Sequence, residues 1–221
     1  MGKLEHKLTN MQLVGLLGGT FNPIHHGHLR LAQELADGLQ LSEVRFIPSA
    51  NPPHKTKPTV SAQQRAEMVK LAIEDNALFK LDTRELERSG ASYTIDTLSA
   101  LYKELNDTAL CLMMGSDAFL KFDTWHRWQE LTDYCHIVLV QRPNHQQVGL
   151  NQNLQNLMQD HYTENITELS KTRAGLITMQ QIPALDISSS QIREMVNQHR
   201  NPMYLCPKSV VDYIQRHGLY L

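Results

Sequence analysis

The sequence lacks the features that define several protein classes. It has only three cysteines, Cys111, Cys135 and Cys206, which lie far apart and form no C-x-x-C pair. Their spacing argues against a disulfide framework and against a zinc site built on cysteine. No apolar run is long enough to cross a membrane, and residues 1–10 have no apolar segment of the kind found in secretory signals. We therefore expect a cytoplasmic protein without a membrane partner.

The chain also lacks an excess of basic residues. It has 21 Lys and Arg against 23 Asp and Glu, a net charge of −2, whereas a nucleic-acid-binding protein normally has a basic surplus or stripe. We therefore expect no nucleic-acid partner, while a small anionic substrate is compatible with this charge because a few local cations suffice. The 221 residues, 41% of them hydrophobic, predict a single domain over 1–221, with 1–10 as a flexible tail.

Strand and helix patterns alternate along the chain. Short apolar runs predict strands at Met11–Leu17, Val44–Pro48, Phe79–Leu86, Ala109–Met114, Cys135–Gln141 and Leu176–Ile182. Helical spacing predicts helices at His28–Leu39, Ala62–Asp75, Tyr93–Leu105, Ser188–Asn197 and Pro207–His217. This alternation predicts an α/β fold with a Rossmann-like, doubly wound parallel sheet and helices on both faces.

Four unusual polar segments follow predicted strands. They are Gly18–His28, Asn51–Lys57, Gly115–Asp117 and Asp186–Arg193. In a parallel sheet, ligands bind beyond the carboxyl ends of the strands, near the point where the strand order reverses. We therefore expect these segments to meet in one ligand site.

The first of these segments, Gly18–His28, has the properties of a phosphate site. Paired glycines let the backbone come close to a ligand, and the start of the following helix offers unpaired N–H groups and a partial positive charge. His25 and His28 stand at that helix start and can donate hydrogen bonds to phosphate oxygens as charge builds on them. The segment therefore predicts chemistry on nucleotide phosphates.

The last of these segments predicts a second phosphate contact. In Ile187–Arg193, serine hydroxyls and N–H groups at a helix start can bind phosphate, and Arg193, one turn into the helix, adds a fixed fork of donors. Together with Gly18–His28, this helix start would clamp a triphosphate from both sides.

Both segments resemble the signatures of a known superfamily. Gly18–His28 is similar to the H-x-G-H motif of nucleotidyltransferases, which class I aminoacyl-tRNA synthetases share, and Ile187–Arg193 resembles their I-S-S-T-x-I-R motif. From about Gly15 to the C-terminus, further segments resemble bacterial nicotinate mononucleotide adenylyltransferases: Asn51–Lys55, Ser92–Leu98, Gly115–Asp117, Trp125 and Gly218–Tyr220. The resemblance implies a nucleotidyltransferase-type fold. It also implies transfer of AMP from ATP to nicotinate mononucleotide in NAD biosynthesis, giving the deamido dinucleotide and pyrophosphate, with Mg²⁺ as cofactor.

The resemblance also implies roles for individual residues. Catalysis is assigned to His25, His28 and Arg193, with His28 at the α-phosphate in the transition state. ATP binding is assigned to Gly18, Gly19, Thr20, Phe21, Gly27, Gly115, Asp117, Ile187, Ser188 and Ser189. Mononucleotide binding is assigned to Asn51, His54, Lys55, Tyr93, Thr94 and Trp125, with Trp125 on the pyridine ring and the Tyr93–Thr94 turn at its carboxylate. No residue is assigned to a dedicated metal site.

Two residues depart from the family pattern. Asn22 stands where the family usually has Asp, so it keeps the size and turn preference but loses a charge, and Ser190 replaces the usual Thr and keeps the hydroxyl. Two alternative functions stay open. One is a related adenylyltransferase that acts on nicotinamide mononucleotide or phosphopantetheine, and the other is a non-catalytic nucleotide-sensing module. The sequence gives no prediction of the oligomeric state.

Overall fold

Six parallel strands form one sheet in the computed structural model, which describes residues 10–50, 59–88, 90–141, 149–183 and 185–221. The strands are β1 (Gln12–Gly19), β2 (Glu43–Pro48), β3 (Phe79–Leu81), β4 (Thr108–Gly115), β5 (His136–Gln141) and β6 (Ile177–Gln181). Their order across the sheet is β3-β2-β1-β4-β5-β6, and every neighbouring pair is parallel. The order reverses at β1, so the predicted doubly wound sheet is confirmed.

Helices connect these strands and follow the last one. They are α1 (His26–Leu39), α2 (Ala62–Ile73), α3 (Thr94–Glu104), α4 (Ser116–Phe119), α5 (Gln152–His161), α6 (Ser189–Asn197) and α7 (Lys208–Arg216), with 3₁₀ turns η1 (Phe122–Thr124), η2 (Trp128–Asp133) and η3 (Ile166–Glu168). Serines cap two helices, because Ser61 Oγ accepts from the N–H of Gln64 and Ser188 Oγ from that of Gln191. The predicted starts of α2 and α6 are therefore confirmed.

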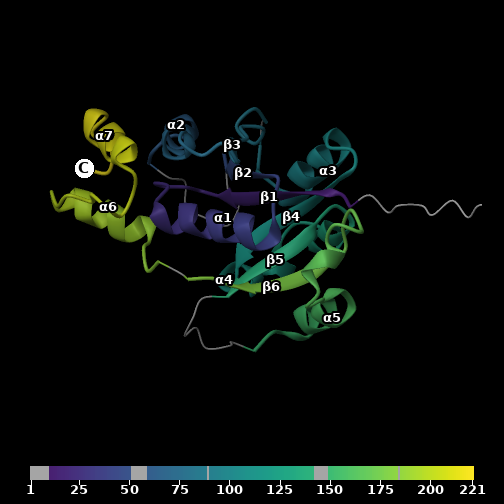
Figure 1. Cartoon of the computed structure of the whole chain (residues 1–221). Helices are drawn as coiled ribbons and strands as arrows, with labels where there is room; N and C mark the ends of the chain where they lie inside the picture. Colours follow the sequence, from purple (N-terminus) through teal and green to yellow (C-terminus); the bar gives the residue numbers. More distant parts are fainter. Residues whose placement is uncertain (1–9, 51–58, 89, 142–148, 184) are drawn as a thin grey trace, which may run out of the picture.

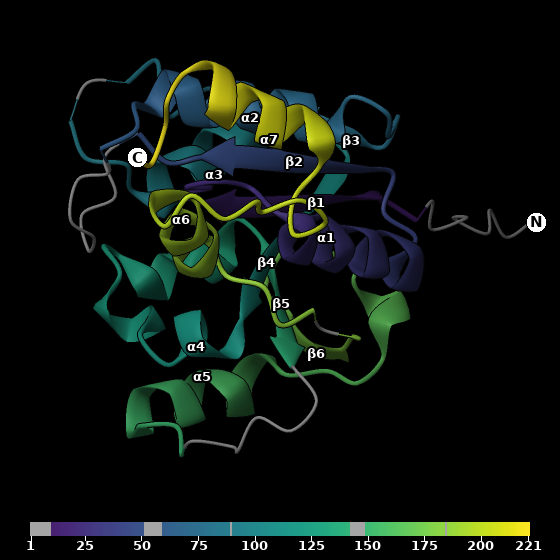
Figure 2. The same ribbon diagram turned by 90° about the vertical axis from the view of Figure 1, so that its left-hand side faces the viewer.

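Each face of the sheet carries its own hydrophobic core. Successive strand residues point to opposite faces: Leu17 and Phe46 pack with α1, α2, α6 and α7, whereas Leu16 and Ile47 pack with α3, α4 and α5. Helices therefore cover both faces, as predicted. Figure 1 shows α6 and α7 at the end of the sheet away from the start of β1, and Figure 2 looks onto that end. The strands point toward it, so these two helices lie beyond their carboxyl ends.

Strand β3 is shorter than predicted. The sequence predicted a strand to Leu86, but the strand ends at Leu81. The side chain of Asp82 accepts a hydrogen bond from the backbone N–H of Arg84 at 3.2 Å, and such a local bond from Asp favours a turn over a ladder. The predicted edge position of this strand is confirmed by the strand order.

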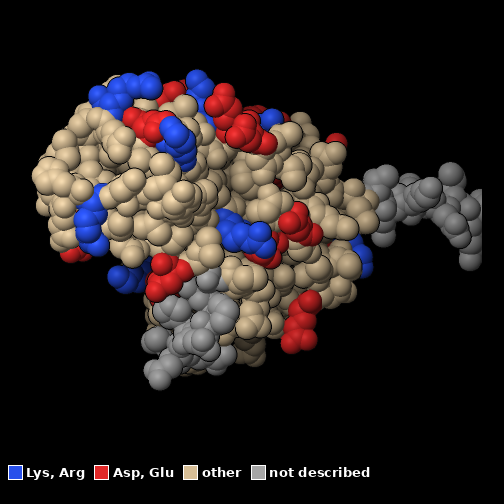
Figure 3. All heavy atoms as spheres, turned by 60° about the vertical axis from the view of Figure 1, so that its left-hand side comes forward, with Lys and Arg blue, Asp and Glu red and all other residues tan. Residues whose placement is uncertain are grey.

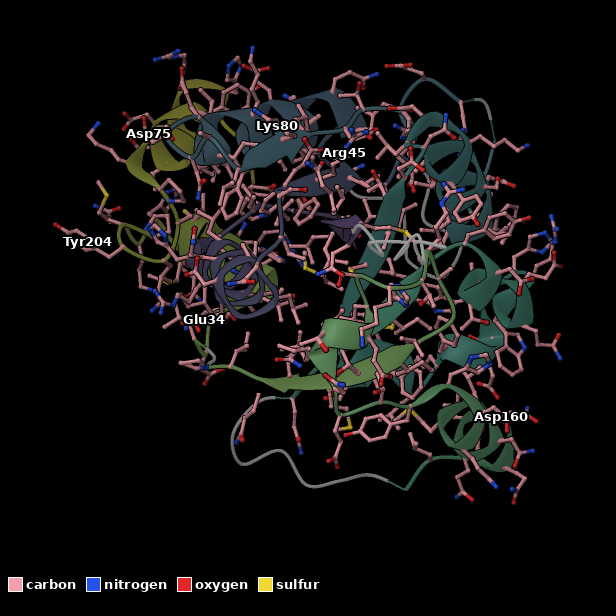
Figure 4. The ribbon with its side chains drawn as sticks, turned by 45° about the vertical axis from the view of Figure 1, so that its right-hand side comes forward. Glu34, Arg45, Asp75, Lys80, Asp160 and Tyr204 are labelled. Atoms are coloured by element: carbon pink, nitrogen blue, oxygen red, sulfur yellow. The ribbon has the colours of Figure 1, made fainter. Side chains whose placement is uncertain are left out.

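A cluster of ion pairs joins the end of α3 to this edge of the sheet. Arg45 of β2 is the register partner of Lys80 of β3, and both are labelled in Figure 4. Arg45 reaches Asp82 and Glu104, and Arg84 contacts the same two carboxylates. Burial raises the pKa of the Asp82 carboxyl, but the hydrogen bonds and charge of Arg84 outweigh this effect and hold the pKa below its usual range. The cluster therefore links the end of α3 to β2 and to the residues after β3.

The surface carries both signs of charge. On the face shown in Figure 3, Lys and Arg lie interspersed with Asp and Glu. Tyr204, in the loop between α6 and α7, is 87% exposed and points away from the body of the protein (Figure 4). In the part of the chain that the structure describes, every helix is too short or too polar to span a membrane.

Candidate active site

Strands β1 and β4 diverge at their carboxyl ends. Pairing between them ends at Leu16 and Leu112, whereas β1 stays paired with β2 up to Gly19, and β4 stays paired with β5 up to Gly115. The last residues of β1 and β4 therefore separate where the strand order reverses, which is the usual ligand site of such sheets. The predicted ATP contacts Gly18, Gly19 and Gly115 lie at this point.

The residues after β1 form a tight turn. Phe21 has a φ of 47°, and the peptide bond between Asn22 and Pro23 is cis. The ring of Phe21 is 2% exposed and meets the ring of His28 edge-on, with centroids 5.1 Å apart. Phe21 was predicted to bind ATP; its side chain belongs to the core and supports His28, which leaves only its backbone for a ligand.

His25 and His28 stack on each other at the start of α1. Their ring centroids lie 3.8 Å apart, with 30° between the planes. The backbone N–H of His25 donates to Nδ1 of His28 at 3.3 Å. A backbone N–H can only donate, so Nδ1 of His28 is an acceptor and the ring proton lies on Nε2. His28 thus carries its donor on Nε2 at the positive end of α1.

Gly27 is required by this arrangement. A Cβ atom at residue 27 would lie 2.9 Å from Nδ1 of His25 and 3.5 Å from the carbonyl oxygen of Ile187. A larger residue would therefore displace the stacked histidines. The same contact places Ile187, a predicted ATP contact at the start of the second motif, beside the start of α1.

Helix α6 is bonded directly to the turn after β1. Nη1 of Arg193 donates to the carbonyl of Asn22 at 2.8 Å, and Oγ of Ser189 donates to the carbonyl of Pro23 at 2.8 Å. Nη2 of Arg193 donates to Oγ of Ser190 at 3.1 Å, so these bonds use two of the five N–H groups of the guanidinium. Two motifs that stand 166 to 171 residues apart thus lie side by side.

Arg65 is a buried residue of this region that the sequence analysis missed. It is 1% exposed, and it donates to the carbonyl of Thr20 at 2.5 Å and to that of Ser49 at 2.8 Å. It joins the turn after β1 to the end of β2, and burial lowers its pKa. The available signal was its spacing: Arg65 lies three and four residues before Met68 and Val69, on the buried face of α2.

The predicted acceptor contacts Tyr93 and Trp125 lie on neighbouring segments. Tyr93 is the N-cap of α3, and its ring stacks on His126 with centroids 4.4 Å apart. Trp125, the residue before His126, is half-buried and packs on Phe122 at 5.5 Å. The start of α3 is therefore adjacent to the segment that carries Trp125, and His126 is a contact that the sequence did not predict.

Thr94 and Asp117, two further predicted ligand contacts, lie at the starts of helices. Thr94 is the first residue of α3, and Asp117 lies in the first turn of α4, directly after Gly115. The first N–H groups of a helix have no partner within the helix. Both starts can therefore donate backbone N–H groups to a ligand.

A buried carboxyl group supports the start of α3. Oε1 of Glu85 accepts from Oγ1 of Thr97 at 2.9 Å, and burial raises the pKa of Glu85 against the opposing effect of hydrogen bonds from Thr97 and Ser92. Oγ of Ser92 also accepts from the backbone N–H of Ala50 at 3.2 Å. These contacts connect the end of β2 to the turn that precedes α3.

Three predicted mononucleotide contacts, Asn51, His54 and Lys55, lie outside the described residues, as does most of the predicted tail. Within the described ranges, no group of three or more His, Cys, Asp or Glu side chains is placed to hold a metal ion. The described part of the site consists mainly of N–H donors, hydroxyl groups and aromatic rings, with the carboxylate of Asp117 at the start of α4.

Comparison with known proteins identifies the family. The model of the cytidylyltransferase-like family matches residues 16–195, which include both phosphate motifs. The chain belongs to the cytidylyltransferase-like family.

Two similar proteins carry the same name. The chain is 46% identical over 207 residues to a protein of Aeromonas salmonicida named "Probable nicotinate-nucleotide adenylyltransferase", covering 94% of this chain and 96% of the relative. A protein of the same name from Acidithiobacillus ferrooxidans is 40% identical over 215 residues, with 97% and 98% covered. The resemblance to nicotinate mononucleotide adenylyltransferases is therefore confirmed.

Solved structures of this family share the fold. The nicotinic acid mononucleotide adenylyltransferase of Plasmodium falciparum, complexed with NaAD, superimposes with a TM-score of 0.70. The two sequences are 17% identical, and 95% of this chain and 97% of that chain are covered. The predicted nucleotidyltransferase type of the α/β fold is thereby confirmed.

Proposed function

We propose that this chain is a nicotinate-nucleotide adenylyltransferase, which transfers AMP from ATP to nicotinate mononucleotide and releases pyrophosphate. The observation that carries the proposal is the junction of β1 and α1, where His28 stands at a helix N-terminus beside Arg193 and Ser189 of α6. The relatives at 40% to 46% identity, all named for this activity, support the choice of acceptor.

The reaction is an in-line displacement at phosphorus. An oxygen of the mononucleotide phosphate forms a bond to the α-phosphorus of ATP, and the bond from that phosphorus to the oxygen bridging to the β-phosphate breaks. Pyrophosphate leaves with the bonding electron pair. The attacking phosphate is already an anion at neutral pH, so the protein needs no general base, and its contribution is positioning and charge stabilisation.

The residues of the two motifs divide this task. His28 Nε2–H donates to the α-phosphate as negative charge builds in the transition state, and the N-terminus of α1 adds its partial positive charge. His25 packs against His28, holds its tautomer through the backbone bond to Nδ1, and contributes a phosphate contact of its own. Arg193, the hydroxyl of Ser188 and the backbone N–H of Ser189, whose own hydroxyl donates to Pro23, hold the β- and γ-phosphates from α6.

The remaining contacts to ATP come from the carboxyl ends of β1 and β4. The backbone of Gly18–Phe21 and Gly27 meets the phosphates, and Ile187 flanks them at the start of α6. Gly115 and Asp117 bind the adenosine ribose. Mg²⁺, when bound with ATP, would neutralise triphosphate charge.

The acceptor is recognised on the other side of the site. Trp125 stacks on the pyridine ring, and the backbone N–H groups at Tyr93 and Thr94 bind the ring carboxylate at the N-terminus of α3. Asn51, His54 and Lys55 flank the mononucleotide. A carboxamide in the same place would set an NH₂ group against N–H donors, and a mismatched buried polar group costs on the order of 1–3 kcal/mol.

The test is pyrophosphate release from the purified protein with ATP and Mg²⁺. Nicotinate mononucleotide, nicotinamide mononucleotide and phosphopantetheine are offered in parallel. We expect strong preference for the nicotinate form. If only another acceptor is turned over, that acceptor replaces nicotinate mononucleotide in the proposal. If none is turned over, the nucleotide-sensing module is favoured.

A further inference from the structure

Four acceptor atoms of the turn after β1 are bonded to side chains from other elements. Arg65 of α2 holds the carbonyl of Thr20, while Arg193 and Ser189 of α6 hold those of Asn22 and Pro23. The fourth acceptor is a side-chain atom: the hydroxyl of Tyr220 donates to Oδ1 of Asn22 at 2.7 Å. Asn22 is thus fixed through both its backbone and its side chain.

Tyr220 reaches this turn because of the way the chain leaves α7. Helix α7 packs on α2, where Oγ of Ser209 donates to the carbonyl of Leu71 at 3.1 Å. Gly218 then adopts a φ of 56°, and Leu219 is buried in the core with its N–H bonded to the carbonyl of Ile214. Burial raises the pKa of Tyr220, so the hydroxyl keeps its proton and acts as the donor.

We propose that Tyr220 is a positioning residue for adenylyl transfer, which acts by holding Asn22 and, through it, the turn that carries His25 and His28. The proposal rests on the proposed function. Asn22 is linked to the histidines on both sides: Phe21, which precedes it, contacts the ring of His28, and the buried Ile24 connects it to His25. A shift at Asn22 therefore moves both rings.

The effect of Tyr220 falls on the transition state. Electrostatic stabilisation depends on donors that are fixed before the charge develops, and a small displacement of a donor weakens it. The acceptor contacts Tyr93 and Trp125 belong to other elements, on the opposite face of the sheet. Loosening the turn therefore lowers kcat while the KM for the mononucleotide changes little.

The first experiment removes each end of the bond. Tyr220→Phe deletes only the hydroxyl, and Asn22→Ala deletes Oδ1 but keeps the carbonyl that Arg193 holds. We expect each to lower kcat about 3- to 10-fold, the loss typical of one hydrogen bond, with the KM for nicotinate mononucleotide within about twofold. Asn22→Asp keeps an acceptor and retains near-wild-type kcat.

Combined variants and a matched control test the assignment. If the two groups act through one bond, Tyr220→Phe in an Asn22→Ala background has no further effect on kcat. Tyr213→Phe removes a hydroxyl from a tyrosine of α7 whose ring stacks on His217 rather than on a residue of the turn, and leaves kcat unchanged. Additive losses in the double variant, or equal kcat values for the Tyr220 and Tyr213 variants, overturn the proposal.

A second measurement does not depend on turnover. Amide hydrogen exchange over residues 18–28, recorded well below the unfolding temperature, should be faster in Tyr220→Phe than in wild type and unchanged in Tyr213→Phe. If the wild-type protein transfers nothing to nicotinate mononucleotide, the proposed function fails but the exchange still reports on Tyr220. Unchanged exchange in Tyr220→Phe overturns the positioning role whatever the acceptor is.

Discussion

At the residue scale, the donor on His28 is set by its neighbour. Because the N–H of His25 occupies Nδ1, the ring presents Nε2–H, and we expect His28→Ala to lower kcat about 10²- to 10³-fold, the usual loss for one transition-state donor. Binding of the mononucleotide, measured by calorimetry, should stay near wild type. His26→Ala is the matched control, and a kcat for His28→Ala close to that of this control would contradict the role.

Glu85 predicts a pH dependence of stability. Its folded pKa is raised above the unfolded value, chiefly by burial, so the protonated form favours the fold and this stability is lost as the pH rises through the folded pKa. Glu85→Gln cannot ionise. The unperturbed glutamate pKa is about 4.3. As the pH rises above this value, we expect the melting temperature of the variant to increase relative to that of wild type. A constant difference across the titration would contradict the raised pKa.

Single residues of the candidate site differ in how well the sequence predicts their roles. His25, His28 and Arg193 stand in local motifs at helix starts, so their neighbours in the chain predict their roles. Arg65 and Tyr220 carry no such pattern, because their partners Thr20 and Asn22 are 45 and 198 residues away. The spacing of Arg65 in α2 indicated burial, and Tyr220 belongs to the resembling segment Gly218–Tyr220, but neither signal identified the partner in the turn after β1.

At the scale of the element, two helix caps provide a matched pair. Ser61 and Ser188 accept hydrogen bonds from the third helical N–H at 3.2 and 3.1 Å, and only Ser188 lies in the candidate site. Replacing either by Ala should lower the free energy of unfolding by about 1 kcal/mol in urea titrations. Ser188→Ala alone should raise the KM for ATP. An equal KM for ATP in both variants would mean that Ser188 only caps α6 and does not bind ATP.

The boundaries of elements were predictable where a local signal exists. Serine caps marked the starts of α2 and α6, and Gly218 with its positive φ marked the end of α7. The prediction for β3 was too long because it extended the edge strand over the polar residues Asp82–Glu85, where a hydrogen bond from the backbone N–H of Arg84 to Asp82 forms a turn instead. The alternation of elements predicted a parallel sheet but not which strands pair.

At the scale of the whole molecule, the three cysteines test whether the chain unfolds as one unit. All are buried: Cys111 and Cys206 belong to the core on one face, and Cys135 to that on the other. Burial raises the pKa of Cys111 to about 12 and that of Cys206 to about 11, so neither thiol reacts in the native state.

A single domain predicts that the three thiols become reactive together. Thiol alkylation in a urea series, read by mass spectrometry, should give one midpoint for all three cysteines, and that midpoint should match the loss of helical circular dichroism. Reaction of Cys206 at clearly lower urea than Cys111 and Cys135 would mean that α6 and α7 open as a separate unit and would contradict the single domain.

The bond between Arg193 and Asn22 also orders events during synthesis. The two residues are 171 positions apart, and a ribosome that adds about 5–20 residues per second needs roughly 9–34 s to cover that distance. Throughout this interval the carbonyl of Asn22 lacks its bond to Arg193. The phosphate site is therefore incomplete until the second of its two motifs has been synthesised.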